Sequence, residues 1–576
     1  MMENKPFRIG LCMAGAVSAG AYTAGVMDFL LEALENWEKK RGEANVPTHR
    51  VTIPVLGGAS AGGMTALLTA SMLNNPSVPV DVPLPEKLYD EHAENKLYHS
   101  WVDLTGADMF PKMLDTTDIT SGKVVSLLNA QFIDEIANKM IRANAEMWKP
   151  TPVYFESPVK VFATLSNLEG YNYNIDFISA RKKDKYNMSV HNDYACFELA
   201  DEEQATSKGW LPLDFKTGVS LATAREAAMA TGAFPLGLRA RTMTREADHI
   251  NEMGWLKDVF NKNPLPSGAK KGLYVDGGMI NNEPFEKVRD ILDDITVATN
   301  PETFENLTER EKLLFDLNSR YDSFENTVLM IDPFPGKESP VFDFDDDLLA
   351  IAGKTLSAMT AQMRAKPADY RSAMETDDAS QFLISPSRLL TNEKGEVLKE
   401  LFGEEAIACG AVSGFGGFLS KEFRIHDYYL GRHNCEVFLR DYFTIPESAL
   451  HNNKIFRDGY AGIDVSAYAT MADRVRSYPI IPLFTPRPAP FTIKMPVFSN
   501  GKNWPTITTK TLERFEKPLR RRIEKIVLNV AELNNFTNAL LWIGSKVVLN
   551  KTLENKVMQA IKKSLATWDL LDSYKE

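Results

Sequence analysis

The first 75 residues repeat one hydrophobic pattern twice: a short continuous apolar run, a loop of small residues, and a segment with apolar side chains at helical spacing. In the first repeat, the run covers residues 7–13 (FRIGLCM), and the helical segment extends from Ala21 to about Trp37. In the second repeat, the run covers 50–56 (RVTIPVL) and the helical segment 64–73. Short apolar runs are typical of buried strands, and a period near 3.6 is typical of amphipathic helices. Two successive strand–loop–helix units therefore predict a parallel sheet with helices on its faces.

Further apolar runs continue this alternation to about residue 340. They predict a helix over 220–231, which ends before Pro235, and strands at 159–164, 173–179, 272–275 and 327–331. The sequence thus predicts a first domain over residues 1–340. Its expected fold is an α/β three-layer sandwich with a mainly parallel central sheet.

Residues 341–576 are expected to form a second, mostly helical region. Residues 479–496 carry six prolines and predict an extended Pro-rich arm, because proline interrupts helices. Residues 501–576 hold 14 Lys and Arg against 8 Asp and Glu, a local charge of +6. Basic residues beside apolar ones at 517–530 fit two arrangements. One is a helix on an anionic membrane surface, and the other is a bundle packed on the first domain with its basic face in solvent.

Composition places this 576-residue chain among ordinary globular proteins, with 44% hydrophobic and 25% charged residues. A net charge of −12 disfavours nucleic acid as a partner, because binding it needs a cationic surface. Four scattered cysteines without a CxxC pair fit neither a zinc site nor a disulfide framework, and they favour a reducing compartment. No run of about 20 apolar residues occurs, and the N-terminal pattern differs from that of a signal peptide. We therefore expect a cytoplasmic protein, with peripheral membrane contact through the basic C-terminal region as the open alternative.

The strongest local signal for chemistry is Gly58-Ala59-Ser60-Ala61-Gly62, a GxSxG sequence between a predicted strand and a predicted helix. Small neighbours permit the sharp turn that lifts a serine hydroxyl clear of the backbone. The helix that follows offers unpaired N–H groups near a developing oxyanion. This position predicts that Ser60 is a nucleophile; a purely structural turn is the alternative.

A serine nucleophile needs a proton acceptor, and the second signal is Tyr274-Val275-Asp276-Gly277-Gly278 at the end of a short predicted strand. Glycines at this point let another loop approach closely. The strand end is expected to place the carboxylate at the same sheet edge as Ser60. Asp-Gly-Gly alone is more often a turn, but together with GxSxG it predicts Asp276 as the base.

The third signal is the small-residue loop 14–20 (AGAVSAG) after the first strand. If the first two strands are neighbours, the backbone N–H groups of Gly15, Ala16 and Val17 lie beside Ser60 and predict donors for a tetrahedral intermediate. A tight turn and a phosphate loop are the alternatives. The phosphate loop is disfavoured because no Walker lysine follows and no GxGxxG is complete.

Together these segments resemble patatin-like phospholipases, and the resemblance covers roughly residues 7–335. Four motifs occur in the family's order: Gly20–Val26 after the first strand, GASAGG around Ser60, the alanine-rich stretch 227–235, and Asp276-Gly277-Gly278 with Asn281, Asn282 and Pro284. Residues 418–439 resemble a segment of larger bacterial patatin-related proteins.

The resemblance implies a lipid acyl hydrolase with a Ser–Asp dyad, here Ser60 and Asp276, and without a catalytic histidine. Such an enzyme cleaves fatty-acyl esters of phospholipids or other lipids through an acyl-serine. A dyad enzyme of this kind is not expected to need calcium or a cofactor. No His, Cys and Asp cluster has metal-ligand spacing, so the sequence implies no metal ion. One departure concerns the oxyanion loop, which in the family is glycine-rich with Lys or Arg just before the glycine that corresponds to Gly20. This chain has Ala19 in that slot, and Ala16 and Val17 in place of two glycines.

Other interpretations remain open at this point. The altered loop also fits a catalytically weak or inactive patatin fold that binds lipid or protein. A Ser–Asp–His triad would need His426 or His433, because the α/β-hydrolase order places the histidine after the acid. An acyl-serine would also serve acyl transfer to an acceptor other than water. Trp101, Met109 and Phe110 are candidates either for an apolar wall beside an acyl chain or for the core.

Overall fold

The structure is a computed structural model. It describes a few residues between 344 and 362, together with residues 5–80, 85–104, 106, 109–120, 122–177, 185–199, 207–261, 263–304, 309–336, 378–391, 396–472, 475–484, 491–530 and 536–572.

Five strands form the parallel part of the main sheet, in the order β3-β2-β1-β8-β9. Their bounds are β1 (Phe7–Met13), β2 (Val51–Gly58), β3 (Phe155–Asp176), β8 (Asn326–Ile331) and β9 (Gln381–Ile384). Every residue of β1 and β2 is buried, which explains why the two N-terminal runs are apolar throughout rather than alternating. The predicted mainly parallel sheet is confirmed.

The other strands of this sheet run mostly antiparallel to their neighbours. They are β4 (Lys185–Leu199), β5 (Leu211–Leu213), β6 (Arg241–Glu246) and β7 (Ala269–Asp276). The two strands predicted at 159–164 and 173–179 are one long strand, β3. Its second half extends past the carboxyl edge of the parallel strands, and β7 pairs with it antiparallel, Leu165 opposite Asp276. Asp276 therefore reaches this edge from the opposite direction, and not as the end of a parallel strand as the sequence suggests.

The sheet separates two buried apolar clusters. Neighbouring residues of β1 point to opposite faces, so Leu11 lies in one cluster and Cys12 in the other. Helix α9 (Phe285–Thr299) completes the cluster around Cys12, for example through Val288. The cluster around Leu11 includes residues of α1 (Gly20–Lys40), α2 (Ala61–Leu73) and α15 (Lys421–Asp441). Helices therefore cover both faces, as the predicted sandwich requires.

Shorter helices fill the connections of this sandwich. They are α3 (Lys96–Tyr98), α4 (Met109–Met113), α5 (Gln131–Met140), α6 (Leu221–Thr231), α7 (Ala247–Asn251), α8 (Lys257–Phe260), α10 (Pro301–Phe304) and α11 (Arg310–Asn318).

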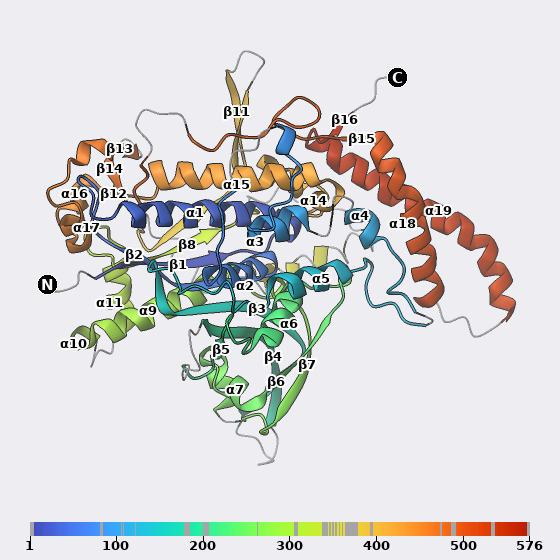
Figure 1. Ribbon diagram of the computed structural model, residues 1–576. Coiled ribbons are helices and arrows are strands. Elements are labelled where there is room, and N and C mark those ends of the chain that lie inside the picture. Colours follow the sequence, from blue (N-terminus) through green and yellow to red (C-terminus); the bar gives the residue numbers. More distant parts are fainter. Residues whose placement is uncertain are drawn as a thin grey trace.

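The C-terminal part is mostly helical, as predicted, and adds small sheets. Its further elements are β10 (Ser387–Thr391), β11 (Val397–Phe402), α14 (Gly416–Leu419), β12 (Thr444–Pro446), α16 (Glu447–Leu450), α17 (Lys454–Gly459), β13 (Thr470–Ala472), β14 (Val475–Pro479), β15 (Ile507–Thr508), α18 (Thr509–Val530), α19 (Phe536–Thr567) and β16 (Leu571–Asp572). In Figure 1, α15 lies along α1, on the side away from the sheet.

Two glycines bring α1 and α15 into backbone contact. A Cβ on Gly25 would lie 1.9 Å from the Tyr428 carbonyl oxygen, and one on Gly431 would lie 2.2 Å from the Tyr22 carbonyl oxygen. Next to this contact, the buried Arg432 of α15 pairs with Asp28 and, at 2.6 Å, with Glu32 of α1. The division of the chain near residue 340 stays a prediction. Beyond that position, β9 joins the main sheet and α15 packs on α1.

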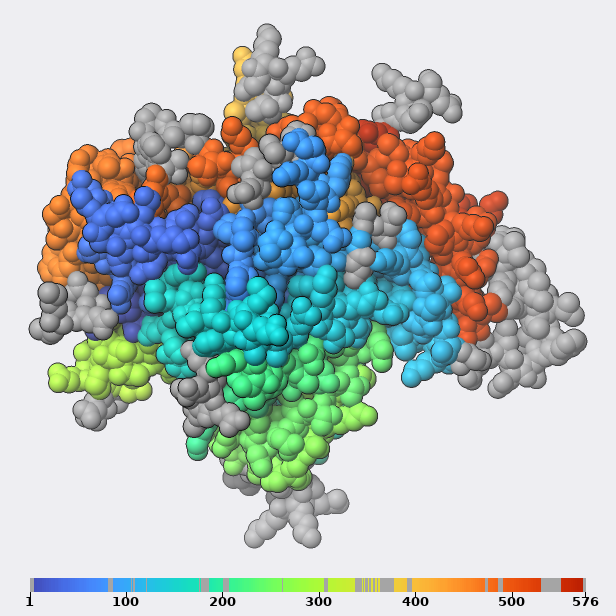
Figure 2. All heavy atoms as spheres, viewed as in Figure 1, coloured from blue at the N-terminus to red at the C-terminus, as the bar shows by residue number. Residues whose placement is uncertain are grey.

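The basic helices α18 and α19 project from one side of the molecule (Figure 1), and in Figure 2 the described residues on that side are orange and red. Arg522 of α18 forms a 2.8 Å ion pair with Asp118 of the sandwich, and Arg520 pairs with Glu554 of α19 at 2.5 Å. Two of the basic side chains in this region are therefore paired with carboxylates of the protein itself. Among the residues that the structure describes, no helix combines the length and apolarity needed to cross a membrane.

The Pro-rich segment 479–496 is partly described, and residues 485–490 lie outside the described residues. Its final part runs beside α15, where the Thr492 and Ile493 amides donate to the Glu436 carboxylate at 2.8 and 2.9 Å. These bonds place the segment against the helix.

Because the α1–α15 contact leaves no space for a side chain, Gly25→Ala is expected to destabilise the protein by about 2–3 kcal/mol. Thermal unfolding of the purified protein would measure this as a lower Tm. Gly254→Ala is the control, since a Cβ there meets nothing within 4 Å. Equal Tm values for the two variants would contradict the close contact.

Candidate active site

Ser60 stands on a sharp turn between β2 and α2. Its backbone has φ 50° and ψ −125°, a conformation that L-residues rarely adopt and that is found where structure holds a functional side chain in place. The flanking glycines are required by contact: a Cβ on Gly62 would lie 2.1 Å from the Met13 carbonyl oxygen, and one on Gly58 2.5 Å from the Gly62 carbonyl carbon. The GxSxG pattern therefore forms a strand-to-helix elbow, as predicted for a nucleophile.

Asp276 ends β7 directly beside this elbow. The Ser60 hydroxyl donates to Oδ2 of Asp276 at 2.5 Å, and the Gly278 amide donates to Oδ1 at 2.7 Å. Ser60 and Asp276 are 6% and 5% exposed, so the pair is largely removed from water. Gly277 is needed as well, since a Cβ there would lie 2.2 Å from the Thr164 carbonyl oxygen. The two side chains that the sequence singles out are thus in direct contact.

Burial changes the acidity of Asp276. Loss of solvation raises the pKa of its carboxyl from the ordinary 3.8 to about 6, while the hydrogen bonds from Ser60 and Gly278 act in the opposite direction. A carboxylate with this pKa is a stronger base than an exposed aspartate, yet it is still ionised at neutral pH.

The loop after β1 passes directly over Ser60. A Cβ on Gly15 would lie 2.9 Å from the Ser60 Cβ, so only glycine allows this approach. The Gly15 amide donates to the Asn282 carbonyl at 3.3 Å, whereas the Ala16 and Val17 amides donate to no residue that the structure describes. Of the three predicted oxyanion donors, only the Gly15 amide therefore has a backbone acceptor among the described residues.

Val17 has φ 48°. A β-branched residue in the left-handed region is a genuine outlier and costs on the order of 1–3 kcal/mol. The resemblance leads one to expect glycine at this position, and the valine found there is strained.

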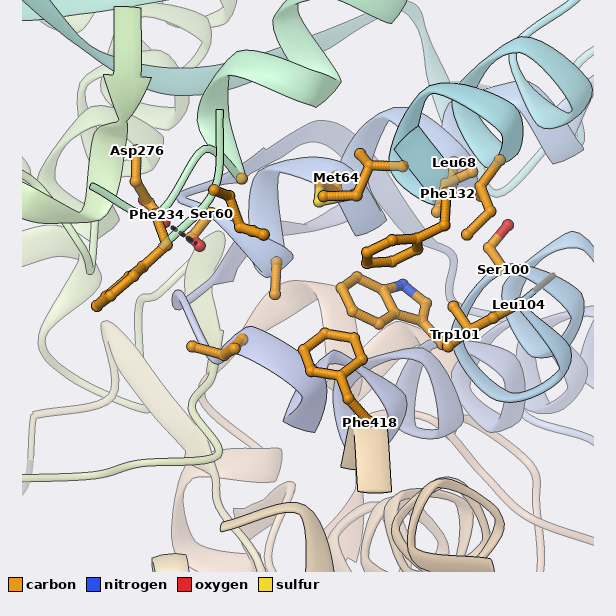
Figure 3. A pocket seen from close by; sticks show the side chains of 16 residues that line it. Ser60, Met64, Leu68, Ser100, Trp101, Leu104, Phe132, Phe234, Asp276 and Phe418 are labelled. Atoms are coloured by element: carbon orange, nitrogen blue, oxygen red, sulfur yellow. Dashed lines mark hydrogen bonds between the residues drawn. The ribbon is translucent and has the colours of Figure 1, made fainter. Parts of the chain in front are cut away.

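An apolar pocket leads away from the Ser60–Asp276 pair (Figure 3). Its walls are mostly aliphatic and aromatic side chains, and in the figure Trp101, Phe132 and Phe418 lie together on the side away from Asp276. The lining residues are Val17, Ser60, Ala61, Met64, Leu68, Ser100, Trp101, Leu104, Phe132, Ile133, Ile136, Gly232, Phe234, Leu238, Asp276 and Phe418. Such a pocket suits a hydrocarbon chain whose polar end lies at Ser60.

Of the three residues predicted as candidates for an apolar wall, only one lines the pocket. Trp101 lines the pocket, but Met109 is buried in the core and Phe110 packs its ring 5.1 Å from that of Phe515 on α18. Phe418, which completes the wall, comes from the C-terminal region, and no local sequence signal marks it as a pocket residue.

The two histidines of the alternative triad are occupied elsewhere. His426 contacts Asp427 through Nδ1 at 2.7 Å, and Nδ1 of His433 lies 3.1 Å from the Ile493 carbonyl oxygen. Neither lines the pocket that contains Ser60. The geometry therefore offers no support for a Ser–Asp–His arrangement with either residue.

Thr231 is a site residue that the sequence interpretation missed. Its hydroxyl oxygen accepts a 2.8 Å hydrogen bond from the Ser60 amide and thereby helps to hold the elbow. The sequence marks the alanine-rich stretch 227–235, which contains Thr231, but it does not indicate the hydrogen bond between Thr231 and the Ser60 amide. Finding it would have required knowing that this helix packs against the GxSxG turn.

Comparison with known proteins agrees with this geometry. The family model described as patatin-like phospholipase matches residues 11–289, which include Ser60 and Asp276. Among curated proteins, an uncharacterized protein of Sinorhizobium fredii, y4iI, is 33% identical over 492 residues. The alignment covers 77% of this chain and 66% of that protein, so this chain spans about two thirds of the relative's length.

Since burial raises the pKa of Asp276, its ionisation destabilises the folded state. The folded protein holds this proton up to about pH 6, and the unfolded chain holds it only up to about pH 3.8. The free energy of unfolding therefore decreases as the pH rises from about 3.8 to about 6. Asp276→Asn removes the cost and is expected to stabilise the protein at pH 8 by on the order of 2–3 kcal/mol. Thermal unfolding at pH 8 and pH 4 provides the test. A variant that is no more stable than wild type at pH 8 would contradict the burial effect.

Proposed function

The chain belongs to the patatin-like phospholipase family over residues 11–289, and on this premise we propose that it is a serine acyl hydrolase that cleaves fatty-acyl esters of phospholipids or related lipids. The family match supports lipid acyl hydrolase activity in general. The Ser–Asp chemistry and the ester preference are our proposal. The observation that carries it is the 2.5 Å hydrogen bond from the Ser60 hydroxyl to the Asp276 carboxylate at one end of an apolar pocket.

In the proposed reaction, Asp276 accepts the Ser60 proton while Oγ attacks the ester carbonyl carbon. The tetrahedral intermediate collapses, the ester C–O bond breaks, and the alcohol leaves with the proton from Asp276. Water then attacks the acyl-serine and gives a proton to Asp276. The bond between the acyl carbon and Ser60 Oγ breaks, Asp276 returns the proton to Oγ, and the fatty acid leaves. Transfer to an acceptor other than water would use the same acyl-serine.

Electrostatics support both halves of this reaction. A pKa of about 6 makes Asp276 a better proton acceptor than an exposed aspartate. The Ala16 and Val17 amides donate to no described residue and belong to the loop that touches Ser60. We propose them as donors to the oxyanion, in a pocket where low polarity strengthens such bonds.

A catalytically weak or inactive lipid-binding protein is the alternative function. Its support is the strain at Val17, whose φ of 48° makes the oxyanion loop costly to maintain. A fluorophosphonate probe separates the two functions, because only an activated serine becomes covalently labelled.

Ser60→Ala is expected to abolish fluorophosphonate labelling and to lower kcat on a fatty-acyl ester by several orders of magnitude, since the nucleophile is lost. Asp276→Asn is expected to leave the fold intact but to lower kcat similarly. For wild type, kcat should rise up to about pH 6 and then level off as Asp276 ionises. Ester cleavage at wild-type rate by Ser60→Ala would refute the proposed function.

We further propose that lipid aggregates contact an apolar rim formed by Leu127, Phe234 and Leu236. Their side chains are 52%, 42% and 82% exposed, and Phe234 also lines the pocket. The Leu127 amide donates to the Leu236 carbonyl at 2.8 Å, so these residues are neighbours. Leu236 has φ 63°, a strained conformation that presents a leucine to solvent. Exposed Lys123 and Arg239 nearby in the sequence would favour anionic lipids.

The rim predicts that Leu236→Asp weakens binding to vesicles of phosphatidylcholine and phosphatidylglycerol about tenfold or more, because burying a leucine is worth roughly 1.5–3 kcal/mol. Co-sedimentation with the vesicles measures this. Leu398→Asp on β11 is the matched control, since Leu398 is 63% exposed and is not part of the rim. If both variants bind equally well, the rim is not the contact surface, and the basic C-terminal helices are the remaining candidate.

A further inference from the structure

We propose that residues 408–417 of the C-terminal region hold the oxyanion loop in its strained, active conformation, with Ser18 as the positioning residue. This inference rests on the proposed function and assigns a role to a part of the chain outside the residues that the family model matches.

Ser18 connects the two segments. It is 1% exposed and directly follows Val17, the residue with φ 48°. Its amide and its hydroxyl both donate to the Gly414 carbonyl, at 3.0 and 2.5 Å. Its hydroxyl oxygen also accepts a 3.0 Å bond from the Gly417 amide. Three hydrogen bonds thus fix the residue next to the strained position, and all three come from the C-terminal region.

The two segments also fit closely. A Cβ on Gly417 would lie 2.7 Å from the Ser18 Oγ and 2.6 Å from the Cys409 Sγ, and one on Gly414 would lie 3.2 Å from the Val17 Cβ. Only backbone fits between these groups. Val17 therefore cannot relax toward residues 408–417 without moving them.

Residues 408–417 are themselves held from α15. The buried Asp427 carboxylate accepts the amides of Ala408 and Cys409 at 2.8 and 2.9 Å. The Arg424 guanidinium donates to the Gly417 carbonyl at 2.5 Å. Because α15 packs on α1 through backbone contacts, residues 408–417 are anchored through α15 to the sandwich.

A second link joins this segment to the last long helix. The Val412 amide donates to the Ser564 hydroxyl of α19 at 2.7 Å. Val412, Ser413 and Gly414 all have left-handed backbones, with φ of 56°, 54° and 89°. Such a run persists only where surrounding contacts determine it. It brings the Gly414 carbonyl to Ser18.

This arrangement makes a distinct kinetic prediction. Oxyanion donors act only when charge develops in the transition state, so their misplacement lowers kcat and leaves KM almost unchanged. Ser18→Ala removes two of the three bonds and is expected to lower kcat by about 10- to 100-fold. Gly417→Ala should give the same kinetic change from the other side of the contact.

The test measures kcat and KM on a soluble fatty-acyl ester, with Tm for each variant. Ser477→Ala is the matched control: this serine is also buried and its hydroxyl donates to a backbone carbonyl, but it lies on β14. We expect Ser18→Ala and Ser477→Ala to have similar Tm values and only the former to lose kcat. The Ser18→Ala loss should shrink to within about threefold when Val17 is also changed to glycine, because glycine adopts φ > 0 without strain.

The outcomes separate this inference from the proposed function. If Ser60→Ala is inactive but Ser18→Ala keeps its kcat within threefold of wild type, the positioning role is wrong and the hydrolase stands. If the loss at Ser18→Ala persists in the Val17→Gly background, Ser18 does not act by holding Val17, and the inference is overturned. Activity that survives Ser60→Ala removes the proposed function itself.

Discussion

The contact between Ser60 and Asp276 constrains the whole arrangement of the sandwich. It joins two residues 216 positions apart and requires that a parallel strand, β2, and an antiparallel strand, β7, end at the same point. The long strand β3 makes this possible, because it pairs with β2 as far as Ala163 and with β7 directly beyond, at Leu165–Asn167. Glycines at the crossing keep the backbones close enough for one hydrogen bond. A change in the register of β7 would turn the carboxyl to the other face.

The site combines features that each reduce stability. Ser60 and Val17 have left-handed backbones, and Asp276 carries a charge where solvation is poor. Such costs are tolerated at functional sites when the surrounding structure compensates for them. Here the surroundings include Thr231, which fixes the Ser60 amide, and Ser18, which is fixed by a segment far along the chain. The strained conformations at the site are therefore held by contacts from other parts of the chain.

The C-terminal region contributes to the structure of the site at several levels. Its strand β9 extends the main sheet, its helix α15 meets α1 backbone to backbone, and its residue Phe418 lines the pocket. The family match ends at residue 289, so these contributions come from a part of the chain with its own sequence constraints. They explain why the glycines on both sides of the α1–α15 contact are needed and why Phe418, a residue outside the family match, lines the pocket.

The sequence by itself determined the local structure and pointed to the two side chains that we propose as the reacting groups. The apolar runs of β1 and β2, the glycines around Ser60 and the strand before Asp276 express steric and solvation preferences that act over a few residues. Tertiary structure alone decided the antiparallel path of β7, the merging of two predicted strands into β3, and the bonds from Ser18 to Gly414, 396 positions away. These contacts depend on how distant surfaces pack in three dimensions. Hydrophobic periodicity and turn chemistry carry no information about such partners.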